Sequence, residues 1–178
     1  MIYEERQTRH ERVILAAKQM LSAARTAPKA KGVDLIECAI IDGEDLKAVS
    51  AHLQKMGEEL GRGGLLRDAA NILQGECIVV IGTRLETMGL NCGHCGYPLC
   101  TEKPTEVPCA FNMIDVGIAV GSACATAADL RMDTRVMYSA GLAAQQLGLL
   151  PGCTGVQAIA VSCASKSPYF DRVRPQPK

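Results

Sequence analysis

Four cysteines are crowded into one short stretch in the second half of the chain. Residues 91–100 read NCGHCGYPLC, and a further cysteine follows in the sequence PCAF at residues 108–111. Four thiolates make a complete metal-ligand shell, and glycines between them let the backbone wrap a metal centre and accept positive φ angles. We therefore expect residues 86–112 to form a cysteine-rich metal-binding loop whose ligands are Cys92, Cys95, Cys100 and Cys109.

The spacing of these cysteines favours an iron–sulfur cluster over zinc. Three ligands lie close together and the fourth trails, whereas a structural zinc site usually presents two short pairs on separate turns. The pattern therefore predicts a four-iron, four-sulfur (4Fe-4S) cluster. Zinc is the alternative, with His94 available as a substitute ligand. The other five cysteines lie in apolar contexts and are interpreted as small core residues: Cys38, Cys77, Cys124, Cys153 and Cys163.

Composition narrows the class of protein. The 178 residues include 19 basic and 19 acidic side chains, so the net charge is zero, and a general binder of nucleic acid or anionic membranes is not expected. Residues 1–12 are rich in charged side chains and lack the apolar run of a secretory signal. Residues 113–128 are apolar, but we expect them to be too short and too rich in small residues to span a bilayer. These features predict a cytoplasmic protein with a single domain over residues 1–178.

Hydrophobic periodicity predicts alternating helices and strands, which indicates an α/β (α+β) fold. The strand at 76–82 is a continuous apolar run, typical of a strand covered on both faces, and the cysteine-rich loop follows it. The expected helices are 3–24, 45–60, 65–73, 115–130 and 134–147, and the expected strands are 33–41, 76–82 and 156–161.

Several motifs carry resemblances to known families. NCGHCGYPLC resembles the Cys-Gly-x-Cys-Gly-x-Pro-x-Cys 4Fe-4S module of electron-transfer subunits and corrinoid iron–sulfur proteins, in which the fourth cysteine trails further than Cys109 does. With ARTAPKAKG, DVGIAVGS, RVMYSAG and KSPYFDR, nearly the whole chain resembles a family of uncharacterised prokaryotic proteins described as containing a ferredoxin domain. This resemblance implies an iron–sulfur cluster and leaves the reaction open.

A more distant likeness runs to nitroreductases, through the basic turn that ends the first helix and through the helix beginning DVGIA at residue 115. It implies a nitroreductase-like three-layer sandwich and a homodimer with flavin mononucleotide (FMN) at the subunit interface. Arg25, Lys29 and Lys31 would then contact the flavin phosphate, and the small face around Gly117 would admit the ring or a partner helix. The alternatives are a solvated basic loop and tight helix packing.

The expected function is therefore electron transfer through a 4Fe-4S cluster to a redox partner protein or a small-molecule electron acceptor. An FMN-dependent oxidoreductase is an extension of this hypothesis, and a zinc-stabilised structural or interaction module without redox activity is the alternative. No nucleophile–base pair stands out, so no catalytic residue is assigned.

Overall fold

The structure is a computed structural model and describes residues 1–170. Four strands form one antiparallel sheet in the order β1-β2-β4-β3. The strands are β1 (Ile36–Ile41), β2 (Cys77–Arg84), β3 (Asp133–Met137) and β4 (Cys153–Ser162), and the helices are α1 (Glu5–Thr26), α2 (Gly43–Glu59), α3 (Gly63–Ile72), α4 (Ala110–Asp129) and α5 (Tyr138–Gln146).

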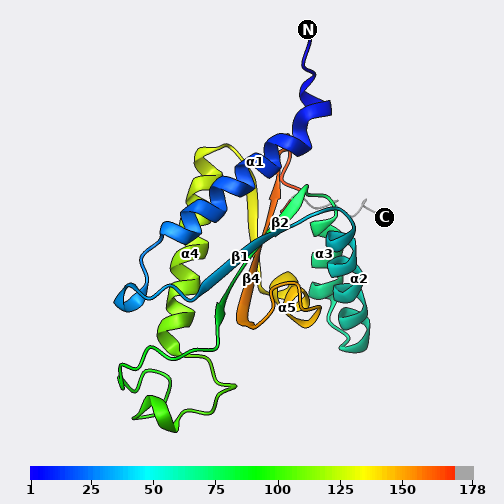
Figure 1. Cartoon of the computed structure of the whole chain (residues 1–178). Coiled ribbons are helices and arrows are strands. Elements are labelled where there is room, and N and C mark those ends of the chain that lie inside the picture. The colour runs from blue at the N-terminus through cyan, green and yellow to red at the C-terminus, as the bar shows by residue number, and fades with distance from the viewer. Residues whose placement is uncertain (171–178) are drawn as a thin grey trace.

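Helices cover both faces of the sheet, so the described part of the chain is a three-layer sandwich (Figure 1). Side chains alternate between the faces along β2, because successive residues of a strand point in opposite directions. Val79 and Ile81 pack with α1 and α4, whereas Ile78 and Val80 pack with α2, α3 and α5. The expected α/β sandwich, with a central strand buried on both faces, is confirmed.

The sequence-based expectation was wrong for residues 134–147, which were assigned to a single helix. Residues 133–137 instead form β3, and the helix begins only at Tyr138. Thr134 and Val136 are β-branched and favour a strand, and β4 supplies the hydrogen-bonding partner that local periodicity does not reveal. The following helix lies close to β4, because a Cβ atom on Gly141 would come within 2.1 Å of the Val156 carbonyl oxygen.

Helix α4 is longer than its expected extent of 115–130 because it starts at Ala110. By length and composition it is the one helix in residues 1–170 long and apolar enough to cross a membrane. The expectation that this segment is too short is therefore wrong. A core helix passes the same test, and Val116, Ala119 and Ala123 of α4 do pack in the cluster shared with α1 and the sheet.

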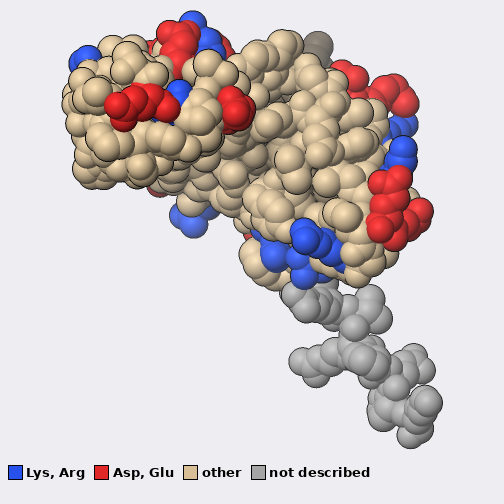
Figure 2. Space-filling view, turned by 90° about the horizontal axis from the view of Figure 1, so that it is seen from below, with Lys and Arg blue, Asp and Glu red and all other residues tan. Residues whose placement is uncertain are grey.

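The cysteine-rich segment is the connection from β2 to α4, and it projects from one end of the sandwich (Figure 1). It holds only one short 3-10 turn, η2 (Cys100–Glu102). Seen from that end, charged side chains of both signs form small separate groups with a broad uncharged area between them (Figure 2). The loop thus lies at the surface of the sandwich. The central strand β2 holds its beginning and the core helix α4 holds its end.

Candidate metal centre

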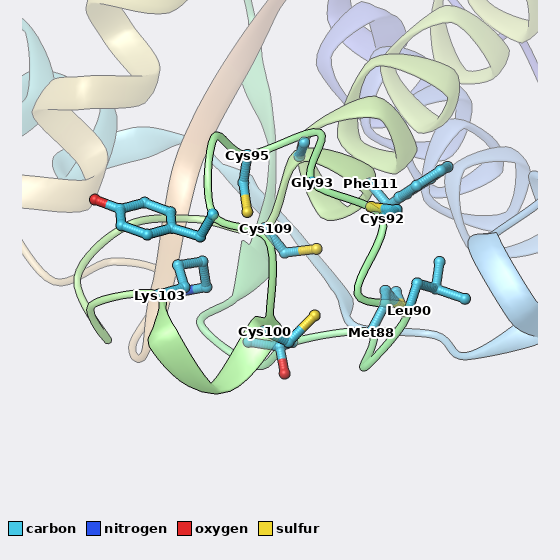
Figure 3. A pocket seen from close by; sticks show the side chains of 12 residues that line it. Met88, Leu90, Cys92, Gly93, Cys95, Cys100, Lys103, Cys109 and Phe111 are labelled. Carbon is cyan, nitrogen blue, oxygen red and sulfur yellow. The ribbon is translucent and has the colours of Figure 1, made fainter.

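The four cysteines expected as ligands line one hollow in this loop. Their side chains come from separate turns and point toward a common space (Figure 3). The space enclosed within the hollow is small, about 10 Å³, and the hollow is partly open to solvent. Its other lining residues are largely apolar and include Met88, Leu90 and Phe111. The loop therefore brings the four thiols together in a mainly apolar environment.

Backbone conformation explains how so short a loop turns so sharply. Gly93 has a φ of +71° and Gly96 a φ of +90°, a region that residues with a Cβ atom rarely adopt. Nothing lies within 4 Å of a Cβ atom built on either glycine. Glycine is therefore favoured here by the backbone angle and not by a lack of space for a side chain. Asn91 also has positive φ, at +50°. The expected positive-φ glycines are thus confirmed.

Asn91 makes two hydrogen bonds that connect the two ends of the motif. Its backbone N–H donates to Cys100 Sγ at 3.4 Å, and its Oδ1 accepts from the Cys100 N–H at 2.8 Å. An amide N–H directed at a cysteine sulfur is one of the contacts through which a protein stabilises a metal-bound thiolate.

The thiols differ in exposure. Cys92 is exposed, Cys95 and Cys100 are partly buried, and Cys109 is buried at 7% exposure. Cys109 is the N-cap residue of α4 and packs with Leu35 and Met88. Cys109 therefore lies at the end of the loop, where the packing around the start of α4 holds it, whereas the other three cysteines lie within the loop.

His94 is oriented by the loop itself. Its Nδ1 lies 3.1 Å from the Cys92 carbonyl oxygen, and its ring packs against Phe111 with centroids 5.3 Å apart. Across residues 1–170, no group of three or more His, Cys, Asp or Glu side chains is arranged to hold a single metal ion. The four thiols thus surround a space but are not gathered around one point.

Two buried polar side chains near the start of α4, whose roles the sequence reasoning missed, connect this helix to the cysteine loop and to the turn η1 (Ala30–Gly32). Asn112 is 1% exposed, and its Nδ2 donates to the Glu86 carbonyl at 2.6 Å. Both carboxylate oxygens of Asp115, 3% exposed, accept from the Ala30 N–H at 3.1 Å. Burial raises the pKa of Asp115, and this hydrogen bond opposes the shift. The available signal was two polar residues about one turn apart in the apolar first half of α4.

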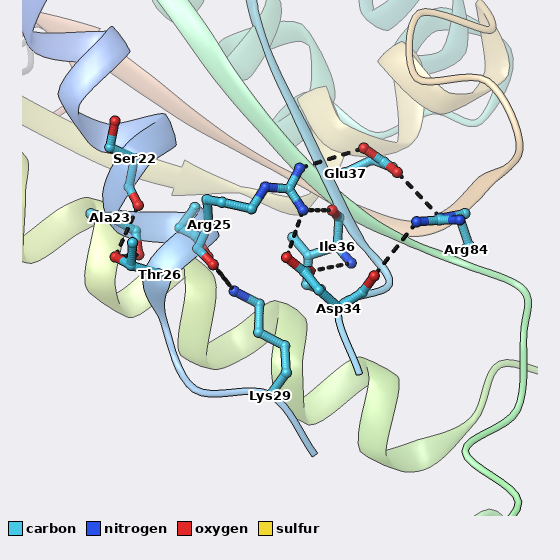
Figure 4. Close-up of polar contacts among 10 residues, drawn as sticks. Ser22, Ala23, Arg25, Thr26, Lys29, Asp34, Ile36, Glu37 and Arg84 are labelled. Atoms are coloured by element: carbon cyan, nitrogen blue, oxygen red, sulfur yellow. Dashed lines mark hydrogen bonds and ion pairs between the residues drawn. The ribbon is translucent and has the colours of Figure 1, made fainter. Parts of the chain in front are cut away.

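The basic residues expected to contact a flavin phosphate are engaged within the protein. Arg25 pairs with Asp34 at 2.8 Å and Glu37 at 3.5 Å (Figure 4). Lys29 Nζ donates to the Ala24 and Arg25 carbonyls at the end of α1, and Lys31 Nζ donates to the Met88 carbonyl at 2.9 Å.

Lys31 therefore links the turn η1 (Ala30–Gly32) to the start of the cysteine loop. Gly117 lies on the exposed side of α4, with nothing within 4 Å of the position of a Cβ atom.

The remaining five cysteines belong to the core of the sandwich. Cys77 and Cys153 are buried, and the other three are partly buried against one apolar cluster. Burial raises the pKa of Cys77 to about 12 and also raises those of Cys38, Cys124 and Cys153. A protonated buried thiol is a poor nucleophile and metal ligand, which agrees with their interpretation as core residues.

Two solved structures share the fold. A nitroreductase with bound FMN from Desulfitobacterium hafniense DCB-2 superposes with a TM-score of 0.57 at 14% identity, over 85% of this chain and 78% of its own. A BluB-like flavoprotein from Clostridium difficile 630 gives a TM-score of 0.54 at 17% identity, over 92% of this chain and 84% of its own. The fold is therefore nitroreductase-like.

Sequence comparison identifies the family. Residues 105–172 match a family described as "Uncharacterized protein containing a ferredoxin domain (DUF2148)", a stretch that includes Cys109 but not the other three loop cysteines. A protein of Archaeoglobus fulgidus, described as "Uncharacterized protein", is 40% identical over 97% of this chain and 98% of its own length. The chain belongs to this family of ferredoxin-domain-containing proteins.

Proposed function

We propose that this protein transfers electrons through a 4Fe-4S cluster held by Cys92, Cys95, Cys100 and Cys109. The observation that carries the proposal is that these four thiols, from eighteen consecutive residues, line one hollow. Membership of a ferredoxin-domain family and the nitroreductase-like fold support a redox role. When bound, such a cluster supplies one-electron chemistry.

The spacing of the cysteines in the sequence favours a cluster over a single ion, because three of them lie close together and the fourth trails. Zinc holds four sulfurs at about 2.3 Å from one point, whereas a cuboidal cluster keeps its cysteine ligands further apart. The largely apolar lining lowers the local polarity, which is one of the factors that set a cluster's potential.

Metal analysis after anaerobic purification and reconstitution tests the proposal. We expect about four iron and four sulfide per chain, with an electron paramagnetic resonance signal after dithionite reduction. The alternative function is a structural module tied by zinc, which changes no oxidation state. Stoichiometric zinc with no iron, in a protein that unfolds on chelation, would support that alternative and overturn the proposal.

A flavin-linked reductase is the second candidate, favoured by the likeness to a nitroreductase that contains bound FMN. Arg25, Lys29 and Lys31 would then contact the phosphate. Each of these side chains already bonds to protein oxygens, so a phosphate would have to displace those contacts. The test is to denature protein reconstituted with FMN and measure the flavin released. If none is released, this candidate loses its electron carrier.

We further propose that two copies of the chain associate through the outer side of α4. Ile114 and Ile118 are 48% and 40% exposed there, and Gly117, Gly121 and Ala125 between and beyond them are also exposed. Small residues allow close approach of a neighbouring backbone, and burial of the isoleucines supplies the apolar driving force.

A further inference from the structure

Lys103 is a buried cation beside the cysteine hollow. It lies between Cys100 and Cys109 in sequence and lines the same hollow as all four cysteines (Figure 3). Only 8% of the residue is exposed, although lysine is among the residues least often buried without a partner. Its position therefore needs an explanation.

Among residues 1–170, the hydrogen bonds of the Lys103 ammonium are with two backbone carbonyl groups. Its Nζ donates to the Pro104 carbonyl at 2.9 Å and to the Val107 carbonyl. Within residues 1–170, no carboxylate lies within 4.0 Å of this nitrogen. Two glutamates are nearby in sequence, Glu102 and Glu106, but both are exposed. The ammonium is thus buried beside the hollow without an anionic protein partner among the described residues.

A buried charge without a counter-charge is costly, because the protein interior replaces hydration poorly. Two carbonyl dipoles offset part of this cost but supply no net negative charge. Four cysteine thiolates around an oxidised 4Fe-4S core carry a net charge of about −2. The hollow that Lys103 lines would then hold the anion that its ammonium otherwise lacks.

We propose that Lys103 is the counter-ion of the four-thiolate centre and that its charge raises the reduction potential of that centre. This inference rests on the proposed function. Reduction adds a negative charge to the cluster, and a fixed positive charge beside the cluster favours the reduced state. Lys103 is a positioning and tuning residue and does not bind the metal.

Three substitutions separate charge from hydrogen bonding and from volume. Lys103→Arg keeps the charge, Lys103→Gln keeps a donor for the carbonyl groups without the charge, and Lys103→Met removes both. Lys18→Met is the control for loss of a lysine charge away from the hollow, because Lys18 lies on the exposed side of α1. Each full-length protein is reconstituted anaerobically, its iron is counted, and its midpoint potential is measured by dithionite titration followed spectroscopically.

We expect the Gln and Met variants to shift the ratio of reduced to oxidised cluster at a given potential by about tenfold toward the oxidised form. That shift corresponds to a midpoint about 59 mV lower for a one-electron couple. The Arg variant and the Lys18 control should stay near the wild-type value. Iron loss in the Gln and Met variants with retention in the Arg variant would also support the counter-ion role, because assembly would then require the charge.

A wild-type potential in the Gln variant overturns the inference, because the contact would then be one of hydrogen bonding alone. Loss of iron from all three variants at position 103 also overturns it, because side-chain geometry would then matter more than charge. If the wild-type protein takes up no iron, the proposed function is contradicted, and the inference about Lys103 is contradicted as well because it rests on that function. Iron content of the wild type thus distinguishes the two failures.

Discussion

At the scale of single residues, the nine cysteines divide by their surroundings. The loop cysteines line a hollow at the surface, whereas Cys77 and Cys153 lie in the core of the sandwich. Cys124, the next cysteine after Cys109, lies fifteen residues further along α4, which is about 22 Å at 1.5 Å per residue. It is too distant to replace Cys109 as a ligand without a large rearrangement.

Cys109→Ser should abolish cluster binding while leaving the fold intact. Serine is a favourable N-cap residue, so it suits the start of α4, but its hydroxyl is a poor ligand for iron. Cys153→Ser is the matched control, because it buries a hydroxyl at an 8% exposed core position and should cost about 1–3 kcal/mol of stability while retaining the cluster. Iron content and urea unfolding measure the two effects. A full cluster in Cys109→Ser would require a different fourth ligand.

Alkylation should separate the two classes of thiol in apo-protein. At pH 8 the exposed Cys92 should react with iodoacetamide in the native state. Cys77 should not react, because burial raises its pKa to about 12 and keeps it protonated. Mass spectrometry of peptides measures the modification, and both residues should react once the protein is unfolded. Rapid native labelling of Cys77 would contradict the core assignment.

At the scale of elements, the sequence predicted the features that depend on residues close together in the chain. The apolar run of β2 was recognisable because a strand buried on both faces requires apolar residues throughout. The glycines of the cysteine loop were recognisable because positive φ favours glycine. The strand β3 was not predicted, because residues 134–147 have helical spacing and the pairing of residues 133–137 with β4 is not visible in the local pattern. The role of Asn112 was missed for a similar reason, because it depends on the Glu86 carbonyl group, which folding brings near it.

Gly96→Ala should weaken the cysteine loop through the backbone alone. Its φ of +90° is unfavourable for a residue with a Cβ atom, while the surrounding space is open. The cost should be about 1–2 kcal/mol, measured as reduced cluster occupancy at limiting iron. Gly64→Ala is the matched control, since its surroundings are equally open and its φ is not positive, and it should be neutral or stabilising in α3. Equal occupancy in the two variants would refute the requirement for glycine.

At the scale of the whole molecule, the sandwich leaves one long apolar helix face uncovered. Its inner side packs with α1 and the sheet, whereas Ile114 and Ile118 face outward. The sequence identified the small residues on α4, but only the packing of the sandwich distinguishes the buried side from the exposed one. The basic turn containing Arg25 likewise gave no sign that Asp34 and Glu37 would lie beside it.

Ile118→Glu should convert a dimer to a monomer, because it places a charge in the centre of the proposed interface. Leu73→Glu is the control, since Leu73 is 50% exposed at the end of α3, which covers the opposite face of the sheet. Light scattering coupled to gel filtration gives the mass of each variant. A dimeric Ile118→Glu variant would place the interface elsewhere, and a monomeric wild type would exclude a stable dimer.

The most direct test of the central claim is the visible absorption spectrum of the anaerobically reconstituted wild-type protein before and after dithionite. A 4Fe-4S cluster on the four loop cysteines predicts a brown protein with broad visible absorption that bleaches on reduction. The same spectrum should be lost in Cys109→Ser and retained in Cys153→Ser. A colourless protein that binds zinc and shows no change with dithionite would contradict the account.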